Sequence, residues 1–368
     1  MSLPGNWTLE NILALSYIRG INVNIQRQTI ETYESLDHVL DADLPPALAA
    51  KLSQGDLFSS PVGPAQAASR QQLELCRRED VDIITIWDDE YPGLMRDIPY
   101  PPVVLYIKGR LESPETVSIA MVGTRRCTTY GKLTAERFAK EFVRAGVIVT
   151  SGLAYGIDTA SHMAAIDAGG TTYAVIASGV DSISPAVSVR NAEKIVESGG
   201  AIISEYPCGT KARPGYFPQR NRIISGISMA TLVVESAARG GALITANFAF
   251  DHQRELFAVP GNINAEKSEG TNKLIHKQMA HIALNPEMVL GELGLTAAQK
   301  NGNSQQVISF TNKLDKIIYE NLNLEPLHID ELADRTGLDM PEILPRLLNL
   351  EFEGLARQLP GKYYIRNK

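Results

Sequence analysis

The sequence predicts an α/β protein built on a mostly parallel central sheet, with smaller modules before and after it. Six short runs rich in β-branched residues follow one another, and most of them are almost continuously apolar. This pattern is typical of strands that are buried on both faces. The runs begin roughly 25–30 residues apart, which leaves room for a crossover helix between successive strands. They occupy residues 117–123, 147–152, 172–179, 200–206, 230–236 and 255–261.

One crossover helix is predicted over residues 131–146, between the first two runs. Its apolar residues Ala135, Phe138 and Phe142 fall on a single helical stripe, which we expect to face the sheet. Gly146 follows as the residue type that most often ends a helix in a left-handed conformation.

Two different regions precede the predicted sheet. Residues 8–55 carry helical apolar patterns, and we expect a small helical domain over residues 1–60. The stretch 56–72 is rich in Pro, Gly, Ser and Ala, so it is predicted to begin as a linker and to become helical. Residues 81–109 predict two strands around a proline-rich turn, annexed to the main sheet in a core of residues 75–290.

The end of the chain predicts another separate module. Polar, aperiodic sequence predicts a linker over residues 291–310. Residues 311–368 predict three helices and a terminal strand, with Gly337 at the turn of a helix-turn-helix pattern. The stretch 341–356 holds one Arg against three Glu, whereas a helix that reads DNA is normally basic. We therefore expect this module to contact another protein or to have a regulatory role.

The composition excludes several classes of protein. No apolar run of the 368 residues reaches the roughly 18 residues that span a bilayer, and the N-terminus lacks the basic start of a secretory signal. The three cysteines form no CxxC pair and suit a reducing cytoplasm. The six histidines form no HExxH motif. We expect a cytoplasmic protein without a metal site or a cofactor.

The charge is distributed unevenly along the chain. Its formal net value is −7, but residues 1–114 hold 9 Lys and Arg against 16 Asp and Glu. Residues 115–285 hold 17 basic against 14 acidic residues. A polyanion is therefore expected to bind the middle of the chain, if it binds at all.

Glycine-rich loops follow several of the predicted strands, where parallel sheets bind their ligands. After 117–123 the loop "GTRRCTTYG" adds the paired cations Arg125 and Arg126. The loops "SGLAYGID" and "ESAARGGALITAN" are also open to a structural interpretation, as tight turns into helices. Glu235 is either a general base or an anchor for backbone amides. Neither a nucleophile elbow nor paired carboxylates are present, so the pattern favours binding over catalysis.

Taken together, these loops resemble the DNA-processing protein A family, also called DprA or Smf. Five motifs occur in the order of the family over residues 115–285. They are "VSIAMVGTRRCTTYG", "SGLAYGIDTASHMAAIDAGGTTYAVIASGVD", "GAIISEYPCGTKARPGYFPQRNRIISGIS", "TLVVESAARGGALITANFAFDHQRELFAVPGNI" and "EGTNKLI". The flanks fit as well, since many members carry a helical SAM-like domain before the core and a winged-helix domain after it.

The resemblance implies an extended Rossmann-like core that binds and protects single-stranded DNA during natural transformation. It also implies loading of the RecA recombinase, formation of a homodimer through the core, and no enzymatic activity. The DNA-binding residues carried over from the matching motifs are Gly123, Thr124, Arg125, Arg126, Gly152, Ala154, Phe217, Pro218, Arg220, Asn221 and Arg222.

Within this set the residue types suggest different roles. Arg125, Arg126, Arg220 and Arg222 are expected to contact phosphates, while Asn221 is expected to fix the local loop. Phe217 is open to two interpretations, a platform on which a base stacks or a plug in the core, and Tyr216 is the alternative platform. The predicted parallel sheet leads us to expect the stretch "YFPQRNR" at the start of a helix opposite "GTRR". Tyr155 departs from the family, which usually has Arg at this position.

The main alternative is an enzyme. The chain also resembles the cytokinin-activating "LOG" phosphoribohydrolases, in which a glycine-rich phosphate loop works with an acidic residue, here Glu235 beside "RGGALIT". The "PGGxGT" run of that family is missing from the sequence. A scaffold that binds only proteins is a third interpretation, which the basic core between acidic flanks makes less favourable.

Overall fold

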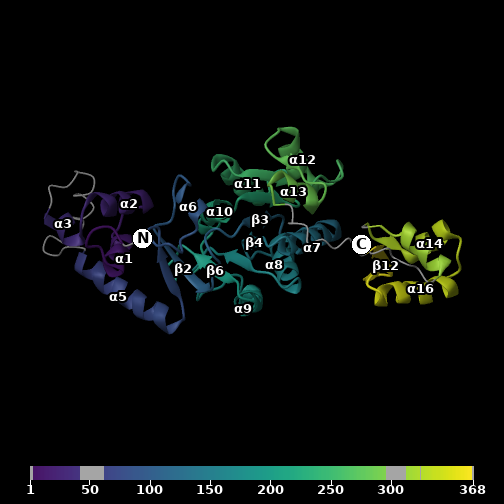
Figure 1. Cartoon of the computed structure of the whole chain (residues 1–368), viewed down its shortest axis with the longest axis horizontal. Helices are drawn as coiled ribbons and strands as arrows, with labels where there is room; N and C mark the ends of the chain where they lie inside the picture. Colours follow the sequence, from purple (N-terminus) through teal and green to yellow (C-terminus); the bar gives the residue numbers. More distant parts are fainter. Residues whose placement is uncertain (1–2, 42–61, 296–311, 324, 367–368) are drawn as a thin grey trace. The chain divides into compact units, whose positions relative to one another are not determined.

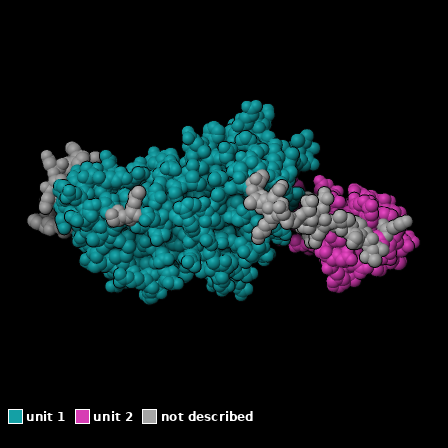
Figure 2. Space-filling view, in the orientation of Figure 1, with its two compact units in different colours: residues 1–127, 135–295 teal, residues 128–134, 296–368 magenta. Residues whose placement is uncertain are grey.

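The computed structural model describes residues 3–41, 62–295, 312–323 and 325–366. The chain divides into two compact units, which are coloured separately in Figure 2. The larger unit contains residues 1–127 and 135–295, and the smaller one contains residues 128–134 and 296–368. Among the described residues, every helix is too short or too polar to cross a lipid bilayer.

A nine-stranded sheet forms the centre of the larger unit (Figure 1), in the order β1-β2-β6-β5-β4-β3-β7-β8-β9. The strands from β3 onward pair in parallel, whereas β1 and β2 join one end of the sheet antiparallel. Their bounds are β1 Asp82–Thr85, β2 Val104–Gly109, β3 Ser118–Val122, β4 Ile148–Ser151, β5 Thr172–Val175, β6 Ala201–Ser204, β7 Ala230–Val233, β8 Glu255–Ala258 and β9 His281–Ile282. All six predicted strands are confirmed, and so is the antiparallel annex; only the two-residue β9 was not predicted.

Helices cover both faces of this sheet, because the side chains of each strand alternate between the faces. On β3, Ile119 and Met121 join one apolar cluster, whereas Ala120 and Val122 join the cluster on the other face. The helices are α6 Gly93–Arg96, α7 Thr129–Arg144, α8 Ile157–Asp167, α9 Val189–Glu197, α10 Tyr216–Gly226, α11 Ala242–Asp251, α12 Glu269–His276 and α13 Pro286–Glu292. The α/β architecture with a mostly parallel sheet is therefore as predicted.

Helix α7 is the crossover helix predicted over residues 131–146. Its residues Phe138 and Phe142 are buried against the sheet, with ring centroids 5.8 Å apart in an edge-on arrangement. Gly146 has a φ of 78° and ends the helix in the left-handed region, as expected from its sequence position.

The N-terminal part of the larger unit is helical. It comprises α1 Leu9–Tyr17, α2 Val23–Thr32, α3 Leu36–Asp41 and the long α5 Val62–Arg78. Thr8 caps α1 and Asn22 caps α2, each accepting a hydrogen bond from a backbone amide of the first turn. The predicted helix within 56–72 is confirmed from residue 62 onward, whereas the predicted linker before it falls within residues 42–61, which lie outside the described residues.

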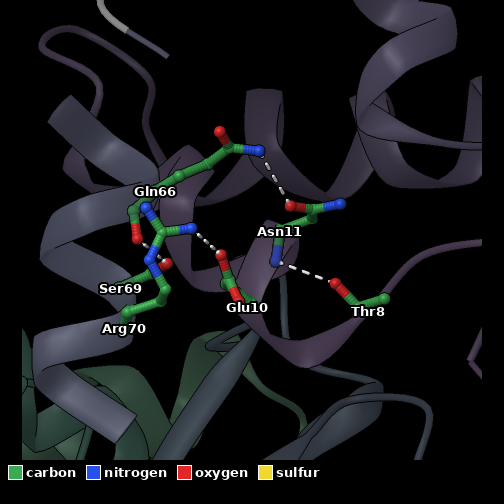
Figure 3. A network of polar contacts seen from close by, with 6 residues as sticks. All are labelled: Thr8, Glu10, Asn11, Gln66, Ser69 and Arg70. Carbon is green, nitrogen blue, oxygen red and sulfur yellow. Dashed lines mark hydrogen bonds and ion pairs between the residues drawn. The ribbon is translucent and has the colours of Figure 1, made fainter. Parts of the chain in front are cut away.

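Helix α5 holds α1 through polar contacts at its exposed side (Figure 3). Arg70 Nη1 lies 2.8 Å from Glu10 Oε1, and the Gln66 amide donates to Asn11 Oδ1 at 3.3 Å. Beneath them, apolar residues of α1 and α5 share one buried cluster with side chains of β2 and β6. The helical segment is consequently packed onto the sheet.

Two of the three cysteines lie close together where α5 packs against the sheet. Cys76 of α5 and Cys208, which follows β6, are both buried free thiols with their Sγ atoms 3.7 Å apart. They are 132 residues apart along the chain, so their spacing in the sequence did not indicate the contact.

The smaller unit contains a domain of winged-helix type, with three helices and a sheet in the order β10-β12-β11 among its described residues, and with its own apolar core. Its elements are α14 Lys313–Asn321, β10 Leu327–His328, α15 Ile329–Thr336, α16 Met340–Phe352, β11 Ala356–Leu359 and β12 Tyr363–Arg366. Gly337, with a φ of 67°, ends α15 before the turn into α16, as the helix-turn-helix pattern predicted. The predicted linker over residues 291–310 lies outside the described residues from residue 296 on.

Candidate nucleic-acid interface

The order of the strands creates a switch point between β3 and β7. From β3 the chain builds the sheet outward through β4, β5 and β6, and then returns to add β7 and β8 on the other side of β3. The loops after β3 and β7 therefore leave in opposite directions, and the carboxyl ends of such strands are where parallel sheets usually bind their ligands. The Thr124 amide donates to the Glu235 carbonyl oxygen at 2.9 Å and joins the two loops at their base.

The loop after β3 presents two cations to solvent. Arg125 and Arg126 are both exposed, whereas Gly123 and Thr124 are only partly so. A β-carbon on Gly123 would lie 2.4 Å from Ile157 Cγ1, so the loop and the start of α8 are in tight contact. The predicted residues at 123–126 thus form a closely packed turn that carries an exposed pair of arginines.

The loop after β4 is held from within by a carboxylate. Asp158 accepts hydrogen bonds from the amides of Gly152, at 3.2 Å, and of Ala154, at 3.3 Å. Burial raises the pKa of Asp158, while the charge of Arg220 and these amide bonds oppose the rise. Tyr155, at the tip of the loop, is exposed.

Helix α10 begins at Tyr216, so the predicted helix entrance is confirmed. Pro218 lies in its first turn, where the missing amide proton costs no helical hydrogen bond. Arg220 points into the interior and is only 5% exposed. Its guanidinium donates to the carbonyl oxygen of Gly152 at 2.7 Å and to that of Val175. Burial lowers the pKa of Arg220 to about 10, so the side chain stays charged at neutral pH.

The predicted meeting of "GTRR" with the start of α10 is also confirmed. The Arg125 guanidinium carbon lies 5.6 Å from the centroid of the Phe217 ring, within the range of a cation–π contact. Phe217 is only partly buried and belongs to none of the apolar clusters of the described residues. The interpretation as a core plug is therefore wrong, and its ring forms part of the surface.

Arg222 lies apart from that pair. It forms an ion pair with Glu205, which follows β6, and the side chain of each is 12% exposed. Burial raises the pKa of Glu205, and the charge of Arg222 opposes this rise. Both residues line a cavity of about 530 Å³ against the loop between α1 and α2. Asn221, between the two arginines, is partly exposed.

Sequence reasoning offered Tyr216 as an alternative to Phe217 for stacking a base, but it missed Tyr206, with which Tyr216 forms a second aromatic element beside α10. The rings of Tyr206 and Tyr216 stack at 4.2 Å with an interplanar angle of 18°, and the Arg213 guanidinium lies 5.8 Å from the Tyr216 centroid. It also passed over Arg239, an exposed cation in the loop after β7. The position of Arg239 after a strand at the switch point was the available signal. Among the described residues, no cluster of three potential metal ligands occurs.

One buried histidine lies behind these loops. His162 of α8 is fully buried, with Nδ1 2.7 Å from Thr172 Oγ1. Burial, followed by the charge of Arg220, lowers the pKa of His162 to about 3. The native state therefore binds fewer protons than the unfolded state below about pH 6.5, and stability is lost as the pH falls through this window.

We expect this histidine to cost about 2 kcal/mol of unfolding free energy between pH 6.5 and pH 5, at about 1.4 kcal/mol per pH unit. Urea unfolding at both pH values should show a loss in the native protein that exceeds the loss in His162→Gln by this amount. The raised pKa of Asp158 acts in the opposite direction in both proteins. Titration of the His162 ring near pH 6.5, followed by NMR, would contradict the expectation.

Comparison with protein families gives two matches. The family described as DNA recombination-mediator protein A matches residues 82–294, and the family described as DprA winged helix domain matches residues 310–362. Together they span the sheet, the candidate interface and the winged helix domain.

Named relatives align over most of the chain. Protein Smf of Escherichia coli is 37% identical over 288 residues, covering 75% of each protein. Protein Smf of Synechocystis is 30% identical, covering 96% of this chain and 98% of the relative. The DNA processing protein DprA of Bacillus subtilis is 39% identical over 222 residues, covering 60% of this chain and 74% of the relative.

Solved structures agree with the fold. DNA processing protein A from Streptococcus pneumoniae superposes with a TM-score of 0.65 at 30% identity, covering 77% of this chain and 98% of that one. DNA processing protein A from Helicobacter pylori, whose structure is described for its single-stranded DNA binding mode, gives a TM-score of 0.52 at 27% identity. It covers 58% of this chain and 95% of that one.

Proposed function

We propose, because this chain belongs to the DNA recombination-mediator protein A family, that it is a DNA-processing protein of natural transformation that binds single-stranded DNA. The observation that carries the site assignment is the exposed pair Arg125 and Arg126, with Arg125 over the face of Phe217. The pair projects from the loop after β3, at the switch point of the sheet. The single-stranded DNA described for the Helicobacter pylori relative supports this class of ligand.

Binding to a single strand without sequence preference needs cations for the phosphates and flat groups for the bases. The two arginines supply the first, and the start of α10, which has no side-chain cap, adds the partial positive charge of a helix N-terminus. Phe217 supplies a ring surface, and the stacked Tyr206 and Tyr216 extend it.

The other predicted residues have supporting roles in this proposal. Arg220 fixes the loop that contains Gly152 and Ala154 from within, so it acts on DNA through the shape of this loop. Gly123 and Thr124 set the turn that carries the arginines, and Pro218 and Asn221 shape the start of α10. Arg222 is neutralised by Glu205, and its contact with a phosphate requires this ion pair to open.

The proposal extends to partners and organisation. The protein would protect incoming strands in the cytoplasm, load the RecA recombinase on them and form a homodimer through its core. It would consist of a helical domain over 1–60, a core over 75–290, a linker and a winged-helix domain over 311–368. We propose no catalytic role, because the carboxylate that a phosphoribohydrolase would need, Glu235, is only 2% exposed. Release of a nucleobase from nucleoside monophosphates would support the enzymatic alternative.

Fluorescence anisotropy with a labelled oligo-dT tests the DNA site. We expect affinity to fall steeply with salt, and Arg125→Ala/Arg126→Ala to reduce the slope of log K against log salt by about 0.7 per lost phosphate contact. The matched control is Arg77→Ala/Arg78→Ala, which removes an equally exposed adjacent pair at the end of α5. Equal slopes for both double variants would reject the site, whereas no binding by the native protein would reject the function.

A further inference from the structure

Helix α16 of the winged helix domain carries a continuous apolar stripe on its outer face. Leu344, Leu348 and Phe352 are 49%, 52% and 80% exposed. They recur every fourth residue, so they line one side of the helix over about two turns. The opposite face already anchors the helix, since Ile343, Leu347 and Leu350 are buried in the core of the domain. The outer stripe is therefore not needed to hold α16 in place.

A helix on the surface of a small domain normally turns polar residues outward. Scattered exposed apolar residues are common, but three large ones aligned on one helix indicate a contact surface. In a helix-turn-helix domain this second helix is the one that would enter the major groove of DNA. In this protein the exposed surface of α16 is apolar and does not suit entry into the major groove.

The charges around the stripe have one sign. Within residues 339–355, all of them described, the exposed charged residues are Asp339, Glu342, Glu351 and Glu353. The one basic residue of this stretch, Arg346, is partly buried and lies 3.6 Å from Asp315. The exposed charges of α16 and its flanking residues are thus all carboxylates, and the uncharged Pro345 and Asn349 are exposed beside the apolar stripe.

This charge pattern distinguishes between the kinds of molecule that could bind the apolar stripe of α16. A nucleic acid or an anionic membrane would be repelled by the carboxylates at both ends of the stripe. A second copy of α16 would bring the same carboxylates against each other, since a symmetric contact pairs identical patches. A helix with its own apolar stripe and flanking Lys or Arg residues satisfies both the apolar surface and the charge.

We propose that α16 is a docking surface for a basic amphipathic helix of a partner protein. Leu344, Leu348 and Phe352 receive the apolar residues of that helix, and the negative charge of Glu342, Glu351 and Glu353 around α16 attracts its cations. The proposal is independent of the DNA site, because it rests only on residues of the winged helix domain.

The probe is a fluorescein-labelled 18-residue helix of Leu and Lys, with Leu on one face, titrated with the full-length protein. We expect saturable binding that Leu344→Ser/Leu348→Ser weakens on the order of tenfold or more. Glu342→Lys/Glu353→Lys should weaken it to a similar extent. A control pair, Glu325→Lys/Asp334→Lys, makes the same change in charge at exposed positions away from α16 and should bind like the native protein.

Several outcomes would overturn the proposal. They are no binding of the Leu–Lys probe by the native protein, equal weakening by the control pair, or unchanged binding by Leu344→Ser/Leu348→Ser. Equally strong binding of a matched Leu–Glu helix would remove the role of charge. Loss of a dimer in sedimentation on Leu344→Ser/Leu348→Ser would identify a second copy as the occupant, and loss of binding to a DNA duplex would identify DNA. If the serine variant does not fold by circular dichroism, the lysine variants decide the question.

Discussion

Replacing Arg220 by methionine is expected to lower the free energy of unfolding by about 3–5 kcal/mol, the usual loss when one member of a buried charged set is removed. The substitution keeps an unbranched side chain of similar length but leaves the carbonyl oxygens of Gly152 and Val175 without their donor. It also leaves the buried carboxylate of Asp158 without the nearby positive charge.

Urea unfolding at pH 7 provides the measurement. Arg213→Met, a change of the same type at an exposed position just before α10, should alter stability by no more than about 0.5 kcal/mol. Adding Asp158→Asn to Arg220→Met should recover part of the loss, because the amide oxygen still accepts from the loop while the unpaired charge is gone. A loss below about 1 kcal/mol for Arg220→Met would show that Arg220 does not hold the loop.

Replacing Gly156 by alanine is expected to weaken binding of oligo-dT by about tenfold, or about 1.4 kcal/mol. Gly156 has a φ of 79°, and a β-carbon there would lie 2.3 Å from the Thr124 carbonyl oxygen and 2.7 Å from that of Arg125. The loop that carries the two exposed arginines and the start of α8 must therefore separate, which disturbs the placement of Arg125 over the Phe217 ring.

The control for this experiment is Gly169→Ala. Gly169 has a nearly equal φ of 77°, but a β-carbon there would have no atom within 4 Å. Both variants should lose about 1–2 kcal/mol of stability from the left-handed backbone alone. Thermal unfolding measures this shared loss of stability, and anisotropy measures the effect of the displaced loop on affinity for oligo-dT. Equal affinity of the two variants for oligo-dT would mean that the position of the loop does not matter for binding.

The sheet was predictable because the decisive signal is local. Each parallel strand is buried on both faces, so a run such as "VSIAMVG" is almost continuously apolar. It can therefore be recognised as a strand from its own residues, without knowing which strands it pairs with. Gly146 and Gly337 likewise mark helix ends by their own backbone requirement. The parallel pairing followed from room for crossover helices, but the order of the strands, with its reversal at β3 and β7, was not predicted.

The roles of the arginines were not predictable in the same way. Arg220 and Arg222 stand two positions apart on α10, and successive helical residues are rotated by about 100°, so their side chains leave opposite sides of the helix. What each one meets is supplied by distant segments, namely the carbonyl oxygens of Gly152 and Val175 for the first and Glu205 for the second. A pattern in a single sequence cannot assign such partners.

The pairing of β3 with β7 also affects how the protein folds while it is being synthesised. Ile119 pairs with Ala230, 111 residues later in the chain. At roughly 5–20 residues per second, a ribosome needs on the order of 5–20 seconds to make the intervening segment. During that time β3 has one unsatisfied edge, which is a template for aggregation in any strand left open. The β3–β7 seam at the switch point thus closes only after β4, β5 and β6 have been made, and only β8 and β9 are added to the sheet after it.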